Sequence, residues 1–560
     1  MVERLLKVLN REWSGLHEAA FLLAGTAFLS QILGLIRDRM LAHHFGAGVS
    51  LDVYYAAFRI PDFLYASIAS FVAVTVLIPF LLQKMEGETT MRGVHTFVNT
   101  IFTVFTFTMI IISVVTYFMI PKLAGSVVPG FSSEETKEYI TLSRILLLSP
   151  LLLGISNLFG AVTQSLRRFF VFAAGPLLYN MGIIIGIVFF LPHFGLVGVV
   201  YGVLIGAMLH LSIQIPVLLR EGVLPRFTTT IHWSYIRGVI KLSIPRTIAL
   251  SATYVATMVL IALASQMQKG SIAIFTLALN LQSIPLAIVG MSYSVAAFPT
   301  LAKLWTGRNH EQFLHQIVNA SRHIMFWSFP AITLFVVLRA QIVRTILGSG
   351  AFDWTATRLT AAALALFAVS VVAQNLVLLY TRAFYAMGKT RRPLVANVVG
   401  GITVVGASFV LLFFFNKFLT FRYFAETLLR VSDTPGTAVL MLPLGYSMGM
   451  IVNITILLFM LRGEFPTFMT HLKKAFLHSF SASVVMGFVA YHGLQLLAHL
   501  EILGTFFAVF LQGFIAGIMG IIAWAFLLYV MENREIEEIR IALHHKFWKS
   551  KPIVAEQEIL

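Results

Sequence analysis

The 560-residue sequence contains no cysteine and few charged residues, and these absences exclude several classes of protein. Without cysteine the chain has no disulfide, no thiolate metal site and no catalytic thiol. Charged residues make up 11% of the chain and hydrophobic residues 58%, whereas soluble domains carry about 25% charge. This composition predicts an all-α membrane protein that crosses the bilayer many times.

Fourteen apolar stretches are long enough to cross roughly 30 Å of hydrocarbon, which predicts about fourteen transmembrane helices. Lys and Arg concentrate in the loops on the side that also holds both termini, and this bias places both termini in the cytoplasm. The same bias explains much of the net charge of +16, so no nucleic acid partner is needed. The predicted spans lie near residues 18–42, 53–83, 94–120, 139–165, 169–192, 196–219, 241–267, 271–298, 314–338, 357–386, 393–415, 437–461, 475–499 and 503–531.

A weak internal similarity recurs at an offset of about 220 residues. Asn157-Leu158 followed by a Pro-x-x-x-Asn motif at 176–180 returns as Asn375-Leu376 and a second Pro-x-x-x-Asn motif at 393–397. The shift is six helices, an even number, so it predicts a parallel repeat and two six-helix lobes around a central cavity, as in transporters. The predicted organisation is a cytoplasmic amphipathic segment (1–17), a first lobe (18–219), a cytoplasmic linker (220–240), a second lobe (241–461), an extra helix pair (475–531) and a cytoplasmic tail (532–560).

Residues 37–62 concentrate charge within the apolar chain. A charged side chain at the bilayer centre costs roughly 3 kcal/mol on insertion scales. We therefore expect these side chains to line a wet cavity, to pair with one another or to bind a ligand. They are Arg37, Asp38, Arg39, Asp52, Arg59 and Asp62.

The same stretch resembles a known family. The pattern runs from Ser30 and Gly34 through Arg37-Asp38 and Phe45-Gly-Ala-Gly48 to Arg59-x-Pro-Asp62. It resembles the opening of the MviN/MurJ family of lipid II flippases, which belong to the multidrug/oligosaccharidyl-lipid/polysaccharide exporter superfamily. Pro245-Arg-Thr247 and residues 279–285 (LNLQSIP) look like the family's seventh and eighth helices.

The resemblance implies a transporter, not an enzyme, that carries a polyprenyl-diphosphate-linked disaccharide peptide across the bacterial cytoplasmic membrane. It also implies that Arg37 and Arg59 bind the diphosphate, because guanidinium groups bind phosphate oxygens bidentately. Asp38 and Asp52 match family acids that would orient those arginines or form state-dependent pairs. Asp62 is expected to pair with Arg59.

The sequence departs from the family at several cavity positions. Gln31, Tyr65, Ala66 and Asn280 stand where the family commonly has arginine. The cavity is therefore expected to hold fewer cations, and Arg246, just after Pro245, is expected to supply a replacement. The predicted substrate-binding residues are Arg37, Arg59, Arg246, Asn280 and Gln31, with Asp38, Asp52 and Asp62 as charge-pairing or gating residues.

Structural roles compete with these functional ones. Arg37 and Asp38 could form a structural pair at the end of a helix, and Arg246 could extend to the cytoplasmic interface. Asp52 follows a Gly-Ala-Gly turn and could cap the helix that begins there. The spans 241–267 and 393–415 contain no acidic residue, so a carboxylate-based sodium site has no support. No metal, cofactor or catalytic residue is predicted, and the sequence identifies no coupling ion.

Other functions remain open at this point. The alternatives are a flippase for another polyprenyl-linked glycan, a drug exporter of the same superfamily and a non-transporting scaffold that binds lipid-linked intermediates. An enzyme is disfavoured because the loops are short and no glycine-rich phosphate loop is present. The expected partners are lipid II or a related polyprenyl-diphosphate glycolipid and membrane lipids, with peptidoglycan synthesis proteins as further candidates.

Overall fold

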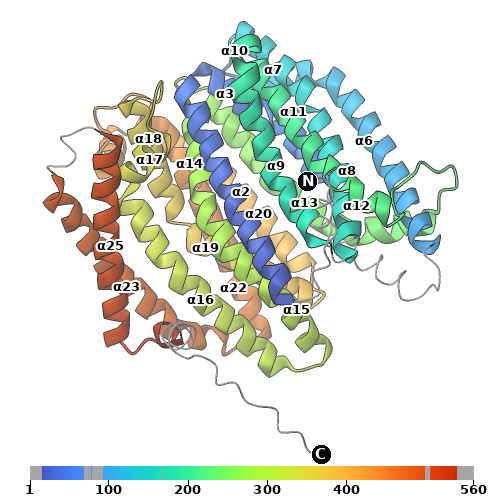
Figure 1. Cartoon of the computed structure of the whole chain (residues 1–560). Helices are drawn as coiled ribbons and strands as arrows, with labels where there is room; N and C mark the ends of the chain where they lie inside the picture. The colour runs from blue at the N-terminus through green and yellow to red at the C-terminus, as the bar shows by residue number, and fades with distance from the viewer. Residues whose placement is uncertain (1–15, 69–76, 78–91, 167, 499–504, 539–560) are drawn as a thin grey trace, which may run out of the picture.

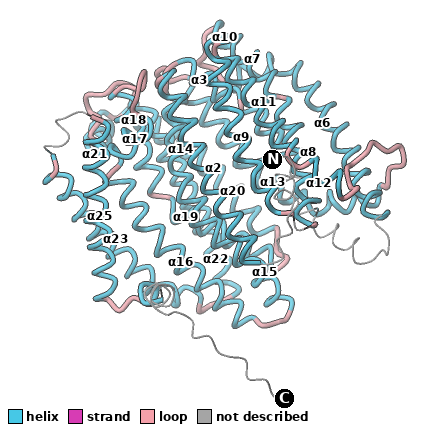
Figure 2. Tube along the Cα trace, viewed as in Figure 1, coloured by secondary structure: helices cyan, strands magenta, loops and turns pink. Residues whose placement is uncertain are grey.

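The computed structural model describes residues 16–68, 77, 92–166, 168–498 and 505–538, with the side chains of residues 16–21, 23, 24, 92, 242, 245 and 246 excepted. Every regular element in these residues is helical (Figure 2), which confirms the predicted all-α fold class. The helices are α2 (Leu16–Phe45), α3 (Val49–Ala57), α4 (Arg59–Ile68), α6 (Arg92–Val127), α7 (Ser133–Leu146), α8 (Leu148–Ser165), α9 (Phe169–Ile185), η2 (Gly186–Phe190), α10 (Leu191–Phe194), α11 (Leu196–Ser212), α12 (Ile215–Arg220), α13 (Trp233–Ser265), α14 (Ser271–Pro285), η3 (Leu286–Met291), α15 (Ser292–Thr306), α16 (His310–Val337), α17 (Arg339–Leu347), α18 (Trp354–Ala368), α19 (Val371–Ala386), α20 (Arg391–Lys417), α21 (Leu419–Leu429), η4 (Thr437–Leu440), α22 (Met441–Glu464), α23 (Phe468–Leu496) and α25 (Phe506–Val530).

The predicted count of fourteen membrane-spanning helices is not confirmed. Within the described residues, eleven helices are long and apolar enough to cross a membrane, or up to twelve if α18 and α19 form one span bent by 45°. The start of the second predicted span is divided at Phe58 into α3 and α4, of 9 and 10 residues. Most of the rest of that span, residues 69–76 and 78–83, lies outside the described residues.

The helices run between two ends of the bundle. Helix α2 begins at Leu16 at one end and reaches Phe45 at the other (Figure 1), and we call these ends the Leu16 face and the Phe45 face. Helix α9 packs on α2 and α11, whereas α14 packs on α18, and α20 packs on α13 and α22. We call α2–α12 the N-half and α13–α22 the C-half; the lobe boundaries given above remain predictions.

Glycines allow two N-half helices to pack with their backbones in contact. A Cβ atom at Gly182 or Gly186 of α9 and η2 would collide with the backbone of Gly206 or Gly202 on α11. In a membrane, where lipid is as apolar as leucine, such close packing is a main source of helix association. The small residues therefore fix α9, and with it the Asn180 side chain that the site uses.

The C-terminal helices α23 and α25 form one edge of the bundle, shown in red in Figure 1. They pack on each other, and they contact the C-half through α16 and α17. Near the Leu16 face, Arg322 of α16 donates a 2.6 Å bond to Glu535, whose side chain is 4% exposed. Phe326 of α16 and Trp524 of α25 add a ring contact at 4.8 Å. These contacts hold the pair against the C-half.

Candidate functional site

Arg37 and Asp38 of α2 form a largely buried ion pair between the two halves. The Arg37 Nη2 and Nε atoms lie 2.8 Å and 2.9 Å from Asp38 Oδ1. The side chains are 21% and 5% exposed. A pair of opposite charges lowers the cost of placing either charge at membrane depth. The structure therefore brings together two of the residues that the sequence predicted.

Two asparagines complete this cluster, one from each half. Asn180 of α9 accepts a bond from Arg37 Nη1 at 3.0 Å and donates to the Ser30 hydroxyl at 3.2 Å. Asn280 of α14 donates to Asp38 Oδ2 at 2.9 Å. Each carboxylate oxygen of Asp38 thus has a partner, one in each half. Asp38 links the halves directly, so any relative movement of α2 and α14 must break or move its bond to Asn280.

Arg59 and Asp62 lie close by at the start of α4. Arg59 Nε donates to the Tyr55 carbonyl oxygen at 3.2 Å, and Asp62 follows it by one helical turn on α4. The expected pairing of Asp62 with Arg59 stays a prediction. Tyr55 is one helical turn before Arg59, which binds its backbone carbonyl. The Tyr55 hydroxyl is buried and has no hydrogen-bond partner within the described part of the chain.

The other predicted residues are placed differently. Gln31 is half-buried on α2, and its neighbour Ser30 makes the contact to Asn180. Tyr65 accepts a 2.7 Å bond from Asn157 of α8, so it holds α4 to α8. Arg246 lies on α13, but its side chain is outside the described residues. The convergence of Arg246 with Arg37 and Arg59 therefore stays a prediction.

Asp52 does not cap its own helix, which corrects one of the two roles considered for it. The residue before α3 is Gly48, and no side chain caps that end. Asp52 instead accepts bonds from the backbone N–H groups of Gly270 and Ala273, both at 2.7 Å and each to a different oxygen. Gly270 immediately precedes α14 of the C-half, and Ala273 lies in its first turn. An anion at a helix N-terminus is stabilised by the helix dipole.

Arg39 makes the complementary contact at the end of another C-half helix. Its Nη1 atom donates to the carbonyl oxygens of Thr345 and Ile346 at 2.6 Å and 3.1 Å. Its guanidinium also lies 5.3 Å from the centre of the Phe506 ring of α25. A cation at the C-terminus of α17 is the favourable partner of the helix dipole. Arg39 and Asp52 therefore hold opposite ends of two C-half helices.

The Phe45 face is closed between the halves by these and further contacts. The glycine turn before α14 packs directly on the N-half: Gly270 has φ +92°, and a Cβ there would collide with the Ala47 carbonyl oxygen. We call the following the gate contacts: Asp52 to Gly270 and Ala273, Arg39 to Thr345 and Ile346, Ala351 N–H to the His43 carbonyl at 2.9 Å, Gly130 N–H to the Ser265 hydroxyl at 3.2 Å, and Lys269 to Glu135 at 2.6 Å.

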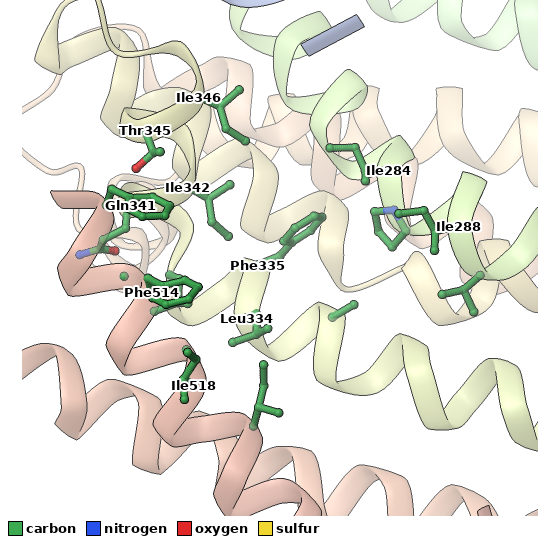
Figure 3. Close-up of a pocket in the computed structure, with 18 residues that line it drawn as sticks. Ile284, Ile288, Leu334, Phe335, Gln341, Ile342, Thr345, Ile346, Phe514 and Ile518 are labelled. Carbon is green, nitrogen blue, oxygen red and sulfur yellow. The ribbon is translucent and has the colours of Figure 1, made fainter. Parts of the chain in front are cut away.

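An apolar groove of about 590 Å³ lies beside the cluster, between the C-half and α25. Figure 3 shows Phe335 and Leu334 of α16 on one side and Phe514 and Ile518 of α25 on the other. The wall contributed by α17 includes Thr345 and Ile346, whose carbonyl groups bind Arg39. The lining is almost entirely hydrocarbon, so the groove suits an aliphatic chain and no charged group.

Three comparisons with known proteins bear on this arrangement. A family model described as lipid II flippase MurJ matches residues 41–512. The curated "Probable lipid II flippase MurJ" of Rhizobium tropici is 27% identical over 410 residues, which are 70% of this chain and 75% of that protein. The "Lipid II flippase MurJ" of Burkholderia cenocepacia is 22% identical over 398 residues, 70% of this chain and 77% of that protein.

Solved structures share the fold. A structure titled "Lipid II flippase MurJ, inward closed conformation" superposes with a TM-score of 0.71 at 21% identity, covering 92% of this chain and all of that one. An inward-facing multidrug resistance transporter of the MATE family superposes with a TM-score of 0.62 at 14% identity, covering 80% and 99% of the two chains. At these identities the matches establish the fold, and the family model carries the assignment to a family.

Proposed function

Because the chain belongs to the lipid II flippase MurJ family, we propose that it moves lipid II from the inner to the outer leaflet of the bacterial cytoplasmic membrane by alternating access. It is a multi-pass membrane transporter and not an enzyme. In this proposal the Leu16 face and both termini are cytoplasmic, and the structure has the exit side closed. The observation that carries the proposal is the Arg37–Asp38–Asn280 link between the halves.

The diphosphate of the cargo would bind at Arg37 and Arg59. A guanidinium group has five N–H donors, and the bonds of Arg37 to Asp38 and Asn180 use three of them. The other two donors can bind phosphate oxygens without breaking the Arg37–Asp38 pair. The buried Tyr55 hydroxyl, which lacks a hydrogen-bond partner within the described part of the chain, would supply a further donor.

The charges of the cluster also indicate why a third cation is needed. Arg37 is paired with Asp38, and Asp62 follows Arg59 on α4. The four side chains carry no net charge when all are ionised, so together they attract a dianion weakly. Arg246 on α13 would add the missing positive charge, since no acidic residue lies on that helix. We therefore keep Arg246 as a proposed substrate-binding residue.

Cargo binding would be coupled to movement through Asp38. A phosphate group competes with the Asp38 carboxylate for the N–H donors of Arg37, because both are anionic acceptors. As Arg37 turns toward phosphate, Asp38 loses part of its pairing, and its bond to Asn280 in the C-half is weakened. The link between the halves then depends on whether the site is occupied, which is the property that alternating access requires.

The polyprenyl chain would lie in the apolar groove beside α25 while the head group is in the cluster. Two contacts connect the groove to the cluster: α14, which carries Asn280, contributes Ile284 and Pro285 to the groove, and Arg39 of α2 binds the α17 wall. Neither element recognises the sugar or the peptide of lipid II. A related polyprenyl-diphosphate glycolipid is therefore the second candidate cargo, supported by the same contacts.

The test is replacement of an essential lipid II flippase by this chain in a bacterial depletion strain. Growth without the native flippase, together with the appearance of labelled lipid II on the outer leaflet, is the expected result. If the chain is made and inserted but no lipid II reaches the outer leaflet, lipid II is not its cargo. The same assay with another lipid-linked glycan then distinguishes the second candidate from a scaffold.

Filling the groove is expected to impair transport of the long-chain cargo. A Cβ at Gly517 of α25 would lie 3.2 Å from Leu338, so Gly517→Phe projects a ring into the groove. Each lost carbon contact costs about 0.1–0.2 kcal/mol, and about ten such contacts correspond to a decrease of roughly five- to thirtyfold. Outer-leaflet lipid II appearance is the measurement. Gly125→Phe, where a Cβ meets no atom within 4 Å, is the control; equal transport by the two variants would contradict the role of the groove.

A further inference from the structure

Helix α21 presents an apolar face to the surroundings at the Phe45 face. The helix is only eleven residues long, yet Leu419, Tyr423, Phe424 and Leu428 are 57–65% exposed. The other exposed residues of this face are the uncharged Thr420 and Thr427. At 100° per residue these six side chains cover about half of the helix surface. A helix that faces water carries its polar residues on that side, so contact of this apolar face with water is unfavourable.

The charged residues of α21 are on the opposite side, where they bind each other and the protein. Glu426 is 3% exposed and accepts a 2.9 Å bond from Arg422 and a 2.6 Å bond from the Thr437 hydroxyl. The Arg422 guanidinium also lies 5.7 Å from the centre of the Phe415 ring. A loop helix in water turns its apolar side toward the protein, whereas α21 turns its apolar side outward and its charged residues to the other side.

The C-terminal end of α21 is fixed rigidly to the C-half. Arg339 of α17 donates to the Leu429 carbonyl at 2.9 Å, and Arg358 of α18 donates to the carbonyl of Arg430. Arg358 also binds both oxygens of Asp433, and this contact holds the pKa of the exposed Asp433 carboxyl below its ordinary value. Arginine groups at the last carbonyls of a helix satisfy otherwise unpaired acceptors. The apolar face therefore keeps a fixed orientation.

The surface next to this face identifies what covers it. The apolar face continues onto exposed side chains of the membrane-spanning helix α20, among them Phe413 and Phe414, and Phe414 contacts Phe418 and Phe421 across the junction. The Lys417 amine, at the end of α20, lies 5.1 Å from the Phe413 ring. Lysine at the end of a spanning helix extends its amine to the headgroup level, so α21 begins at that level.

From this continuity we propose that α21 lies in the leaflet at the Phe45 face, with Leu419, Tyr423, Phe424 and Leu428 among the phospholipid acyl chains just below the headgroups. Such interfacial helices bury their apolar face by roughly 5–10 Å. The six side chains of this face are uncharged, and the one cation within α21, Arg422, is 48% exposed on the opposite side, so apolar burial is the main source of binding. The proposal is independent of which cargo the protein carries. Through Arg339 and Arg358, α21 sets the depth of α17 and α18 relative to this leaflet.

Site-directed spin labelling tests the depth of α21, and the lack of native cysteine makes each label unique. Phe424→Cys and, as the matched control in the following loop, Ser432→Cys are labelled in the full chain and reconstituted at low protein density in phosphatidylcholine vesicles. Residue 432 is exposed on the same face of the bundle. We expect the label at 424 to be relaxed by oxygen and protected from a water-soluble nickel chelate, and the label at 432 to show the reverse.

Two outcomes would overturn the proposal. Equal access of the nickel chelate to both labels would place α21 in water. Protection of the 424 label from oxygen as well as from nickel would show that protein covers the face. Dependence of that protection on the protein-to-lipid ratio would identify a second copy of this chain as the cover. Neither outcome bears on transport of lipid II, so failure of this proposal is distinguishable from failure of the proposed function.

Discussion

Replacing Arg37 by alanine is expected to abolish rescue of a strain that lacks its lipid II flippase. The guanidinium is the central donor of the cluster, with bonds to Asp38 and Asn180. Loss of a charge-assisted hydrogen bond costs about 1.5–3 kcal/mol, and loss of two to a diphosphate corresponds to a decrease of roughly a hundredfold or more in cargo affinity. Growth on depletion and outer-leaflet lipid II are the measurements. Arg144→Ala, which removes a half-buried arginine of α7 that binds the Tyr117 carbonyl, is the control for net charge.

A double variant separates phosphate binding from simple charge pairing. If Arg37 serves only to neutralise Asp38, removing both charges in Arg37→Ala/Asp38→Asn leaves no unpaired buried carboxylate, keeps an acceptor oxygen for Asn280, and should restore transport. If Arg37 binds the diphosphate, the double variant stays inactive although it is made and inserted at the wild-type level. Activity of Arg37→Ala at the Arg144→Ala level would contradict the role of the cluster altogether.

Asp52→Ala is expected to open the Phe45 face and to lower transport strongly. The change leaves the N–H groups of Gly270 and Ala273 without their acceptors, and each unpaired buried N–H costs about 1–3 kcal/mol. A loss of at least about 2 kcal/mol shifts the balance between closed and open forms by roughly thirtyfold. Asp52→Asn is expected to be milder, because its single acceptor oxygen can satisfy one of the two N–H groups.

A cysteine pair across the halves reports this shift directly. Glu135 and Lys269 bind each other at 2.6 Å on the Phe45 face, and surface pairs of this kind contribute at most about 1 kcal/mol. Cysteines at both positions, joined by a short bifunctional reagent, should cross-link efficiently in the parent chain and poorly with Asp52→Ala. Undiminished cross-linking in the Asp52→Ala chain would show that the bonds of Asp52 to α14 do not keep the Phe45 face closed.

The sequence predicted the fold class and part of the cluster because those features leave local signals. Long apolar stretches predict membrane helices whatever their packing. Arg37 and Asp38 are adjacent, and charges in an apolar chain must find partners. Asn180 also had a signal, since it closes the Pro-x-x-x-Asn motif that recurs at residues 393–397, although the repeat gave no reason to assign it to the site.

The gate contacts could not be predicted because their partners are distant in sequence. Asp52 binds the N–H group of Gly270, 218 residues later in the sequence, and Arg39 binds carbonyl groups more than 300 residues away. The local Gly-Ala-Gly turn before Asp52 favoured a cap of its own helix, and tertiary packing decided otherwise. The groove could not be predicted either, because its lining residues, such as Leu334 and Phe514, are of the same types as the residues of any lipid-facing span.

Because the groove lies on the α25 side, the two edges of the bundle are not equivalent in the plane of the membrane. Helix α6 lies at the opposite edge of the bundle (Figure 1). If the cargo's chain enters through the groove, delivery is one-sided. A neighbouring protein that supplies the lipid must then approach along α25, whereas a neighbour packed against α6 would leave the route free. The α25 side must therefore stay accessible to the lipid-supplying protein while other proteins assemble around the transporter.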